Sequence, residues 1–299
     1  MLDLVLKSLL SLKQYGFLET LKKCILYIKK KITYLGPIKQ RNIKKINRKL
    51  NKKKIKICIQ VHIFYIELID EIINHLNFMP FPFHCYISTS NSENIAIIEN
   101  EFRKCKNAQK IFIEKFENRG RDVAPFICQM RNKIYNYEYI LHIHTKKSLT
   151  SNTYGDDWRE YLFNNLLGSS ENIYYIFRYF IYRKKTGIIF PETYYPVKPS
   201  MLWGTDIEQG KKNVYEFLKK INCETDLGDN PVFTSGNMFW ARTKAVKNAF
   251  YTGINQNDFP DENNQIDMTL AHAIERSWVY IALYNGYIFL QMNQNNLRE

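Results

Sequence analysis

Hydrophobic and polar positions alternate in blocks along residues 55–116. Short runs rich in Ile, Val and aromatic residues are typical of buried strands, and the segments between them fit helices. The expected strands are 55–64, 83–88 and 111–116, and the expected helices are 67–76 and 93–105. This β-α-β-α-β order predicts a largely parallel sheet with helices on its faces.

A polar turn and a helix follow the third of these strands. Asn118, Gly120 and Asp122 form the turn, and the helix is expected from about 123 to 135. Pro125 suits the first turn of that helix, where a missing N–H costs nothing. Asp122 is a candidate cap for the same helix.

The next expected strand, 139–143, ends in a burst of polar and basic side chains. His144, Thr145, Lys146, Lys147 and Ser148 come directly after it. The carboxyl ends of parallel strands meet at one edge of a sheet, which is where open α/β sheets place ligands. We therefore expect Thr89, Asn118 and His144 to share one edge.

The second half of the chain mixes helices and strands in a less regular order. The expected helices are 156–167, 172–183, 214–221, one from 244 and 266–275, and the expected strands are 187–191, 234–241 and 287–291. The predicted fold class is therefore α/β, with a Rossmann-type mixed sheet flanked by helices.

The N-terminal segment is basic and amphipathic. Apolar residues recur at helical spacing through 1–35, and a Gly-Pro pair at 36–37 ends the run. Residues 1–56 hold 17 of the 43 Lys and Arg residues, but only Asp3 and Glu19 among the acidic ones. The other 243 residues hold 26 basic and 27 acidic side chains, which argues against a nucleic-acid groove across the fold.

Two interpretations of this basic segment stay open. A Lys-rich amphipathic helix can lie on an anionic membrane surface, or it can pack on the body of the protein with its lysines solvated. Residues 39–56 continue it as a basic linker or helix. We expect a helical extension over 1–54 and a second domain over 55–299.

The six cysteines argue against a zinc ribbon, because no pair has Cys-x-x-Cys spacing. Cys58, Cys85 and Cys128 lie in apolar runs and are expected to be small core residues, which suits a reducing cytoplasm. No apolar stretch reaches the length of a membrane span, and the N-terminus lacks the features of a secretion signal.

Two stretches carry a family resemblance, Asn-Arg-Gly-Arg-Asp-Val-Ala-Pro-Phe at 118–126 and Leu-His-Ile-His-Thr-Lys-Lys-Ser at 141–148. Their turn, helix and strand resemble inverting glycosyltransferases of the GT-A fold, in which the strand ends in a metal-binding Asp-x-Asp. To within a residue, His144 and Lys146 stand in that position here. The amino-acid sequences of both stretches resemble those of the rhamnan synthesis protein F family, and the resemblance covers roughly residues 55–292.

The resemblance implies a GT-A-like fold and transfer of an activated deoxysugar, L-rhamnose linked to a nucleoside diphosphate. It places the donor at the ends of the early strands. The candidate donor-binding residues are His62, Thr89, Asn118, Gly120, Arg121, Asp122, His144, Lys146 and Lys147. Lysines can neutralise phosphate without a metal, and Arg121 can add a bidentate contact. A solvated turn is the alternative for the two lysines.

A metal is the competing interpretation of the same strand end. His142 and His144 lie on one face of the strand and, with His272, could ligate Mg or Mn. A packed core histidine is the simpler interpretation of His142. Because two lysines beside a cation would repel it, we predict that transfer needs no metal.

The resemblance also points to a base for the acceptor hydroxyl. Related enzymes place an acidic residue ahead of a helix that leads to a Gly-aromatic strand, and Asp267 holds that position here. His272 lies about one helical turn further on, so both side chains can face the cleft. Asp261 and Glu262 are rivals for the role, and a surface cap is the alternative for Asp267.

The second half of the chain builds the acceptor side in the family pattern. The candidate acceptor-binding residues are Trp158, Arg159, Ser235, Asn237, Trp240, Glu275 and Arg276. Core packing is the alternative for the two tryptophans. A structural ion pair is the alternative for Glu275 and Arg276.

Together these patterns predict a glycosyltransferase of bacterial surface-polysaccharide assembly, inverting and independent of metal. The expected partners are a nucleoside-diphosphate sugar and a lipid-linked glycan at the inner face of the cytoplasmic membrane, with no nucleic acid. The alternative is a non-catalytic sugar-binding or assembly subunit that has lost Asp-x-Asp. Turnover of a donor separates the two.

Overall fold

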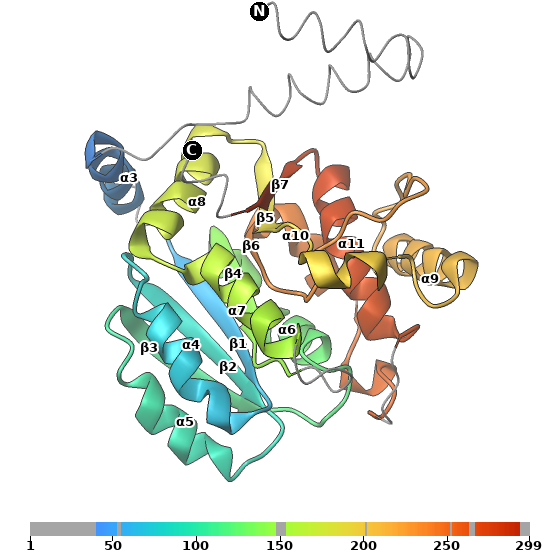
Figure 1. Ribbon diagram of the computed structural model, residues 1–299, viewed down its shortest axis with the longest axis horizontal. Helices are drawn as coiled ribbons and strands as arrows, with labels where there is room; N and C mark the ends of the chain where they lie inside the picture. The colour runs from blue at the N-terminus through green and yellow to red at the C-terminus, as the bar shows by residue number, and fades with distance from the viewer. Residues whose placement is uncertain are drawn as a thin grey trace, which may run out of the picture. The chain divides into compact units, whose positions relative to one another are not determined.

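A seven-stranded mixed sheet has the order β3-β2-β1-β4-β6-β5-β7 (Figure 1). Its strands are β1 Ile57–Ile63, β2 Phe83–Thr89, β3 Ala108–Lys115, β4 Tyr139–His144, β5 Thr186–Pro191, β6 Phe239–Arg242 and β7 Ile288–Met292. Strands β1 to β4 are parallel to one another, while β6 runs antiparallel to its neighbours β4 and β5. The predicted α/β class with a mixed sheet is confirmed.

The computed structural model describes residues 40–52, 55–147, 154–200, 202–251, 253–262 and 267–293. The helices within these ranges are α3 Gln40–Lys52, α4 Ile69–Leu76, α5 Asn94–Phe102, α6 Val123–Met130, α7 Tyr154–Leu167, α8 Ser170–Tyr182, α9 Ile207–Lys220, α10 Thr243–Val246 and α11 Leu270–Tyr284. The helices expected within 1–35 lie outside the described residues. None of the described helices has both the length and the apolar character that crossing a membrane requires.

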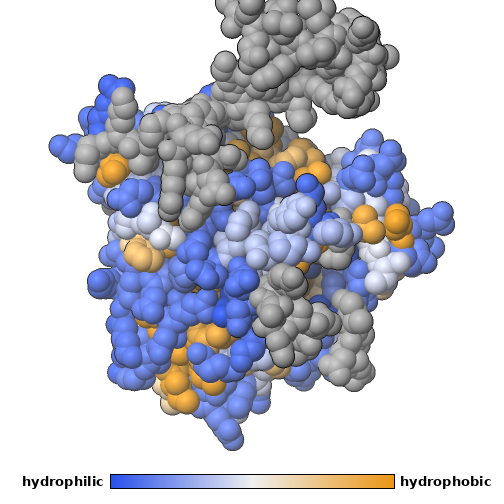
Figure 2. All heavy atoms as spheres, in the orientation of Figure 1, coloured by the Kyte–Doolittle hydropathy of each residue, from blue (hydrophilic) through white to orange (hydrophobic). Residues whose placement is uncertain are grey.

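Helices cover both faces of the sheet, as the parallel half predicts (Figure 1). Residues of α6, α9 and α11 join inward-facing residues of β4, β5 and β6 in one apolar cluster, which includes Phe126, Ile140, Phe239 and Trp278. On the opposite face, Trp240 of β6 packs against Phe177 of α8 and donates to the carbonyl of Leu166 in α7. The face seen in Figure 2 is largely hydrophilic, with an apolar cluster over α4 and α5.

Helix α3 shows how the described part of the basic segment is held. Its apolar residues Ile46 and Leu50 are buried. Asn47 Oδ1 accepts a hydrogen bond of 3.1 Å from the hydroxyl of Tyr174 in α8, and Lys49 lies over the ring of Tyr182. Helix α3 therefore packs on the body, while its Lys44, Lys45 and Lys49 are exposed to solvent.

The strand predicted over 234–241 is wrong in its first half. Residues 234–237 form a turn, in which Gly236 has φ 86° and Asn237 has φ 52°, and the strand β6 begins only at Phe239. Left-handed backbone cannot continue a strand, and glycine adopts it without steric cost. Two helices also differ from the prediction: α9 begins at Ile207, where Asp206 caps it through the N–H of Gln209, and α11 begins only at Leu270.

Candidate active site

The four parallel strands end at one edge of the sheet. In the register, His62 at the end of β1 lies beside His144 at the end of β4 and beside Ser88 of β2. Thr89 pairs with Ile63 one position further on. The prediction that Thr89 and His144 share one edge is therefore confirmed.

A buried chain of polar contacts runs across the sheet behind this edge. Ser88 Oγ lies 2.9 Å from His62 Nδ1 and accepts a hydrogen bond of 3.0 Å from Gln60 Nε2. Gln60 Oε1 lies 2.6 Å from His142 Nδ1, and the His142 ring stacks on Phe126 of α6. Burial lowers the pKa of His62 to about 4 and also lowers the pKa of His142. His62 is therefore neutral at pH 7.

The buried network of polar contacts continues from His142 to Asp122. Its Oδ2 atom lies 3.1 Å from His142 Nε2 and 3.7 Å from His144 Nε2, and it accepts a hydrogen bond of 2.6 Å from Asn237 Nδ2. Burial alone would raise the pKa of Asp122, but the positive charge of His144 and hydrogen bonds from His142 and Asn237 outweigh burial and hold it well below its usual range. Asp122 is thus an anion at every physiological pH.

The prediction that Asp122 caps α6 is wrong. It stands at the N-cap position, but its backbone is already helical and its side chain makes no capping hydrogen bond. A capping oxygen must turn back to the N–H groups of its own helix. Here the carboxylate turns instead toward His142 and Asn237, because these donors lie buried beside it.

In the turn before α6, the side chains of Arg121 and Asp122 contact different partners. Gly120 has φ 63° and Arg121 has φ 55°. A Cβ on Gly120 would lie 2.4 Å from the ring of Phe259, so only glycine fits there. Arg121 points to the other side of the turn and donates 3.0 Å from its Nη1 to Nε2 of His272. Asn118, at the start of this turn, is exposed.

Gly236 joins the end of β4 to helix α11. Its carbonyl oxygen lies 2.9 Å from His144 Nε2, and its N–H donates 2.9 Å to Oε1 of Glu275. The Nδ1 atom of His144 lies 3.1 Å from the carbonyl oxygen of Thr145. Both ring nitrogens therefore face carbonyl oxygens, which only accept, and an imidazolium satisfies both at once.

The two lysines after β4 have different surroundings. Lys146 Nζ lies 4.0 Å from the ring centroid of Trp158. Burial lowers its pKa, opposed by the negative charges of Glu275 and Asp122. Lys147 is exposed, pairs with Glu67 and lies over the ring of Tyr65. Lys146 is therefore the lysine that shares the interior of the site.

Arg159 holds the backbone of this loop. Its Nε donates 2.9 Å to Glu71, and its Nη1 donates 2.9 Å to the carbonyl of Lys146 and 2.5 Å to Asp156. The side chain is only 8% exposed. Arg159 thus positions Lys146 from behind, and its acceptor-binding role stays a prediction.

Asp267 is held by four donors just before α11. Arg276 donates to it through both Nη atoms, at 2.9 and 3.0 Å. The backbone N–H groups of Met268 and Thr205 bind the same two oxygens at 2.7 and 3.2 Å. Burial would raise the pKa of Asp267, but the contacts with Arg276 outweigh it and lower the pKa. Its role as the base stays a prediction.

His272 is neutral and fully engaged. It lies in the first turn of α11, where Nδ1 is 2.8 Å from the hydroxyl of Thr269, while Nε2 accepts from Arg121. Burial, followed by the charge of Arg121, lowers its pKa to about 4. The two rival acids contact arginines of the turn before α6. Asp261 binds Arg119 at 2.7 Å, and Glu262 lies 3.6 Å from Arg121.

The predicted acceptor residues are divided between site and core. Trp240 is fully buried, so the core alternative holds for it. Asn237 is buried in the contact with Asp122. Among the predicted acceptor residues, Trp158 Nε1 and Ser235 Oγ are buried polar atoms without a hydrogen-bond partner in the structure. Glu275 and Arg276 do not pair directly, since Arg276 binds Asp267.

Two contributors were not predicted from the sequence. Gln60 is a polar residue between the apolar Ile59 and Val61 of its strand, which is a signal that was available. Trp278 donates 2.9 Å to Asn237 Oδ1 from α11, and no local pattern marks it.

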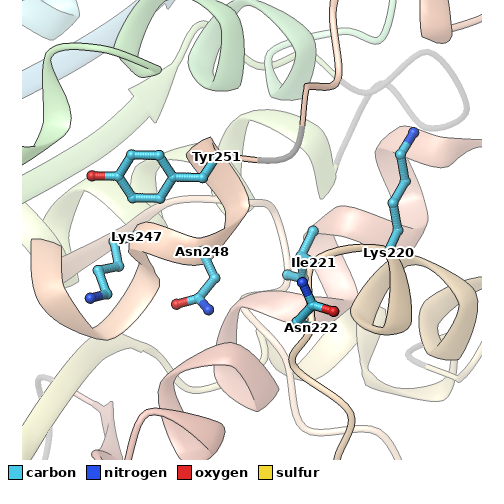
Figure 3. A pocket seen from close by; sticks show the side chains of 6 residues that line it. All are labelled: Lys220, Ile221, Asn222, Lys247, Asn248 and Tyr251. Carbon is cyan, nitrogen blue, oxygen red and sulfur yellow. The ribbon is translucent and has the colours of Figure 1, made fainter.

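No metal-binding cluster is found among the described residues, and one pocket lies apart from this edge of the sheet. Within the residues that the structure describes, no three His, Cys, Asp or Glu side chains are grouped to hold a metal ion. A separate pocket of about 360 Å³ lies where α9 ends, lined by Lys220, Ile221, Asn222, Lys247, Asn248 and Tyr251. Figure 3 shows the side chains of Lys220 and Lys247 pointing in different directions, so they form no convergent cation site.

A buried anion flanked by histidines, with cations beside it, thus lies at the carboxyl edge of the parallel strands, which is the edge where open α/β sheets place ligands. The chain belongs to the rhamnan synthesis protein F family (RgpF), which matches residues 6–287. Membership indicates a role in polysaccharide biosynthesis.

Two curated relatives, both named WxcX, come from Xanthomonas campestris pv. campestris, strain B100 and strain ATCC 33913. Each is 32% identical to this chain over 233 residues, which is 77% of the chain and 32% of the relative. The chain thus spans about a third of the length of these relatives.

Proposed function

We propose that this chain is a GT-A-like glycosyltransferase, which moves a sugar from a nucleoside diphosphate to a growing bacterial polysaccharide. The observation that carries the proposal is Lys146, held beside Asp122 and His144 at the carboxyl edge of the parallel strands. Open α/β sheets bind nucleotides at this edge. A leaving diphosphate needs fixed positive charge, which Lys146, Arg121 and His144 can supply there.

The finer assignments belong to the same proposal. The family name supports L-rhamnose or another deoxysugar as the transferred sugar. His62, Thr89, Asn118 and Gly120 would line the donor side with the cations, and inversion with no metal would be the reaction course. Trp158 and Ser235 would meet the acceptor through the two polar atoms that lack partners, because buried donors are costly until a ligand pairs with them.

The first prediction concerns donor binding and turnover by the full chain. A nucleoside diphosphate present at 100 times its dissociation constant should stabilise the protein by about 2.7 kcal/mol. We expect a thermal-shift screen to show this with one nucleoside diphosphate and its sugars. We also expect release of that nucleoside diphosphate from the sugar donor, even with water as acceptor.

Two results would contradict the proposal. Stabilisation without release from any nucleoside-diphosphate sugar would favour a non-catalytic sugar-binding subunit. No stabilisation by any nucleoside diphosphate would remove the donor site itself.

The second prediction concerns the membrane surface. The sequence of residues 1–37 has an apolar stripe with lysines between its apolar residues. We propose that they hold the enzyme near a lipid-linked glycan at the inner face of the cytoplasmic membrane. Each basic residue near an anionic surface contributes about 1 kcal/mol, so the full chain should co-sediment with anionic vesicles and detach as salt rises.

The matched variant lacks residues 1–37 and keeps α3 with its contacts to α8. It should bind anionic vesicles much more weakly than the full chain does. Equal binding of the full chain to neutral and anionic vesicles, or no loss on truncation, would rule the idea out.

A further inference from the structure

Three carboxylates surround the site, and their free oxygens differ. Both oxygens of Asp267 bind Arg276 and backbone N–H groups. Asp122 has Oδ2 in the buried network with His142 and Asn237. Of the two carboxylate oxygens of Glu275, only Oε1 has a hydrogen-bond partner within the described part of the chain, which is the N–H of Gly236 at 2.9 Å. Glu275 is thus anchored at one oxygen and open at the other.

Glu275 is also linked to the donor side through a single residue, Gly236. Gly236 gives its N–H to Glu275 and its carbonyl oxygen to His144, so the two side chains lie on either side of the same glycine. A Cβ at Gly236 would lie 2.7 Å from Leu162 and 3.3 Å from the ring of Trp158. The glycine therefore lets α7, α11 and the end of β4 converge where Lys146 lies over Trp158.

We propose that Glu275 is the catalytic base, whose Oε2 accepts the proton of the acceptor hydroxyl. This inference rests on the proposed glycosyl transfer. Asp267 then has a positioning role: it binds Arg276, which follows Glu275 directly in α11. Asp122 serves as the fixed anion that orients His144.

The reaction balances with these groups alone. The acceptor oxygen forms its bond to the anomeric carbon while its proton moves to Oε2 of Glu275. The bond from the anomeric carbon to the diphosphate oxygen breaks, and the diphosphate leaves with the electron pair. Lys146 and Arg121 face the negative charge that develops on it.

The electrostatics of the carboxylates agree with this division of roles. Burial raises the pKa of Glu275, although the charges of Arg276 and Lys146 oppose the rise. The pKa of Asp267 and that of Asp122 are both lowered. A base works best when its pKa lies near the working pH, and environments that separate carboxylate pKa values mark acid–base roles. Of the three, Glu275 is the carboxylate whose pKa is shifted upward, toward neutral pH.

The test is Glu275→Gln in the full chain, with release of nucleoside diphosphate from a panel of nucleoside-diphosphate sugars as the readout, L-rhamnose first. Glutamine keeps an oxygen for the N–H of Gly236 and removes the proton acceptor. Release should fall about 100- to 10,000-fold, as is typical when general-base help is lost. The thermal shift given by the nucleoside diphosphate alone should not change, because the diphosphate binds elsewhere.

The pH profile separates a base from a merely structural residue. In the wild type, release should decline on the acid side with a midpoint above the ordinary Glu pKa of about 4.3. Glu275→Gln should lack that decline, and the control Glu224→Gln, an exposed glutamate bonded only to Tyr215, should keep it.

Asp267→Asn completes the comparison. We expect it to lower the melting temperature and to keep the acid decline in its remaining activity. Wild-type release by Glu275→Gln, or loss of the acid decline in Asp267→Asn instead, would overturn the assignment while leaving the transferase function in place. A wild type that turns over no donor would refute the transferase function, and the inference with it.

Discussion

Asp122→Asn should lower the free energy of unfolding by about 3–5 kcal/mol, the usual cost of removing one partner of a buried charged pair. The side chain of Asp122 is 10% exposed and faces His142, His144 and Asn237. An asparagine side chain has one oxygen and one N–H₂ group, so it leaves the charge of His144 buried without its counterion. Chemical unfolding at pH 7 measures the loss.

The pH dependence gives this prediction a definite sign. The folded pKa of Asp122 lies below its unfolded value, so the unfolded chain binds the proton first as the pH falls. The contribution of Asp122 is complete above the ordinary Asp pKa of about 3.9 and is lost progressively below it. The stability difference between wild type and Asp122→Asn should therefore shrink as the pH falls below about 3.9.

Two histidines add a separate acid effect in the wild type. The pKa values of His62 and His272 are lowered to about 4, so stability should begin to fall below the ordinary His pKa of about 6.5. The control Asp229→Asn removes an exposed carboxylate and should leave stability unchanged. A loss for Asp122→Asn no larger than for this control would contradict the network.

The parallel half of the fold could be predicted because its signals are local. Each strand from β1 to β4 is an apolar run, and the parallel order fixes where the strand ends meet. The predicted bounds therefore differ from the observed ones by only a few residues. The turn at 234–237 was missed because Met238 and Phe239 look like a continuing strand, while the left-handed backbone of Asn237 is required by a contact with Asp122, 115 positions away.

The site shows the same limit. Its position at the strand ends, and the basic residues after β4, follow from the sequence. Which way a side chain turns does not, because it depends on residues from other elements. Asp122 turns inward since Asn237 and His142 lie there, and Asp267 is occupied because Arg276, two turns along α11, reaches back to it. The sequence predicted a helix cap at Asp122 and a base at Asp267, because spacing along the chain does not show the residues that contact them.

Lys146→Met should reduce release of nucleoside diphosphate from the donor by about 100- to 1,000-fold, the usual cost of removing one group that stabilises developing negative charge. Methionine keeps an apolar chain against Trp158 and removes the cation. The same variant should also bind the nucleoside diphosphate more weakly, because Lys146 faces the diphosphate in the ground state as well.

Lys133→Ala is the matched control for charge. Lys133 pairs with Glu114 and lies over the ring of Tyr86, away from Lys146. Its loss should change neither release nor binding. Because burial lowers the pKa of Lys146, wild-type release should also decline on the alkaline side below the ordinary Lys pKa of about 10.4. That decline should be absent from Lys146→Met.

A chelator distinguishes fixed cations from a metal. If Lys146, Arg121 and His144 stabilise the leaving diphosphate, wild-type release should persist in excess chelator. The two lysines after β4 would repel a divalent ion placed beside them, whereas they attract a diphosphate. The charge-based account would be wrong if chelator abolished activity and manganese or magnesium restored it, and if Lys146→Met released nucleoside diphosphate at nearly the wild-type rate. It would assign the leaving group to a metal held by histidines at the end of β4.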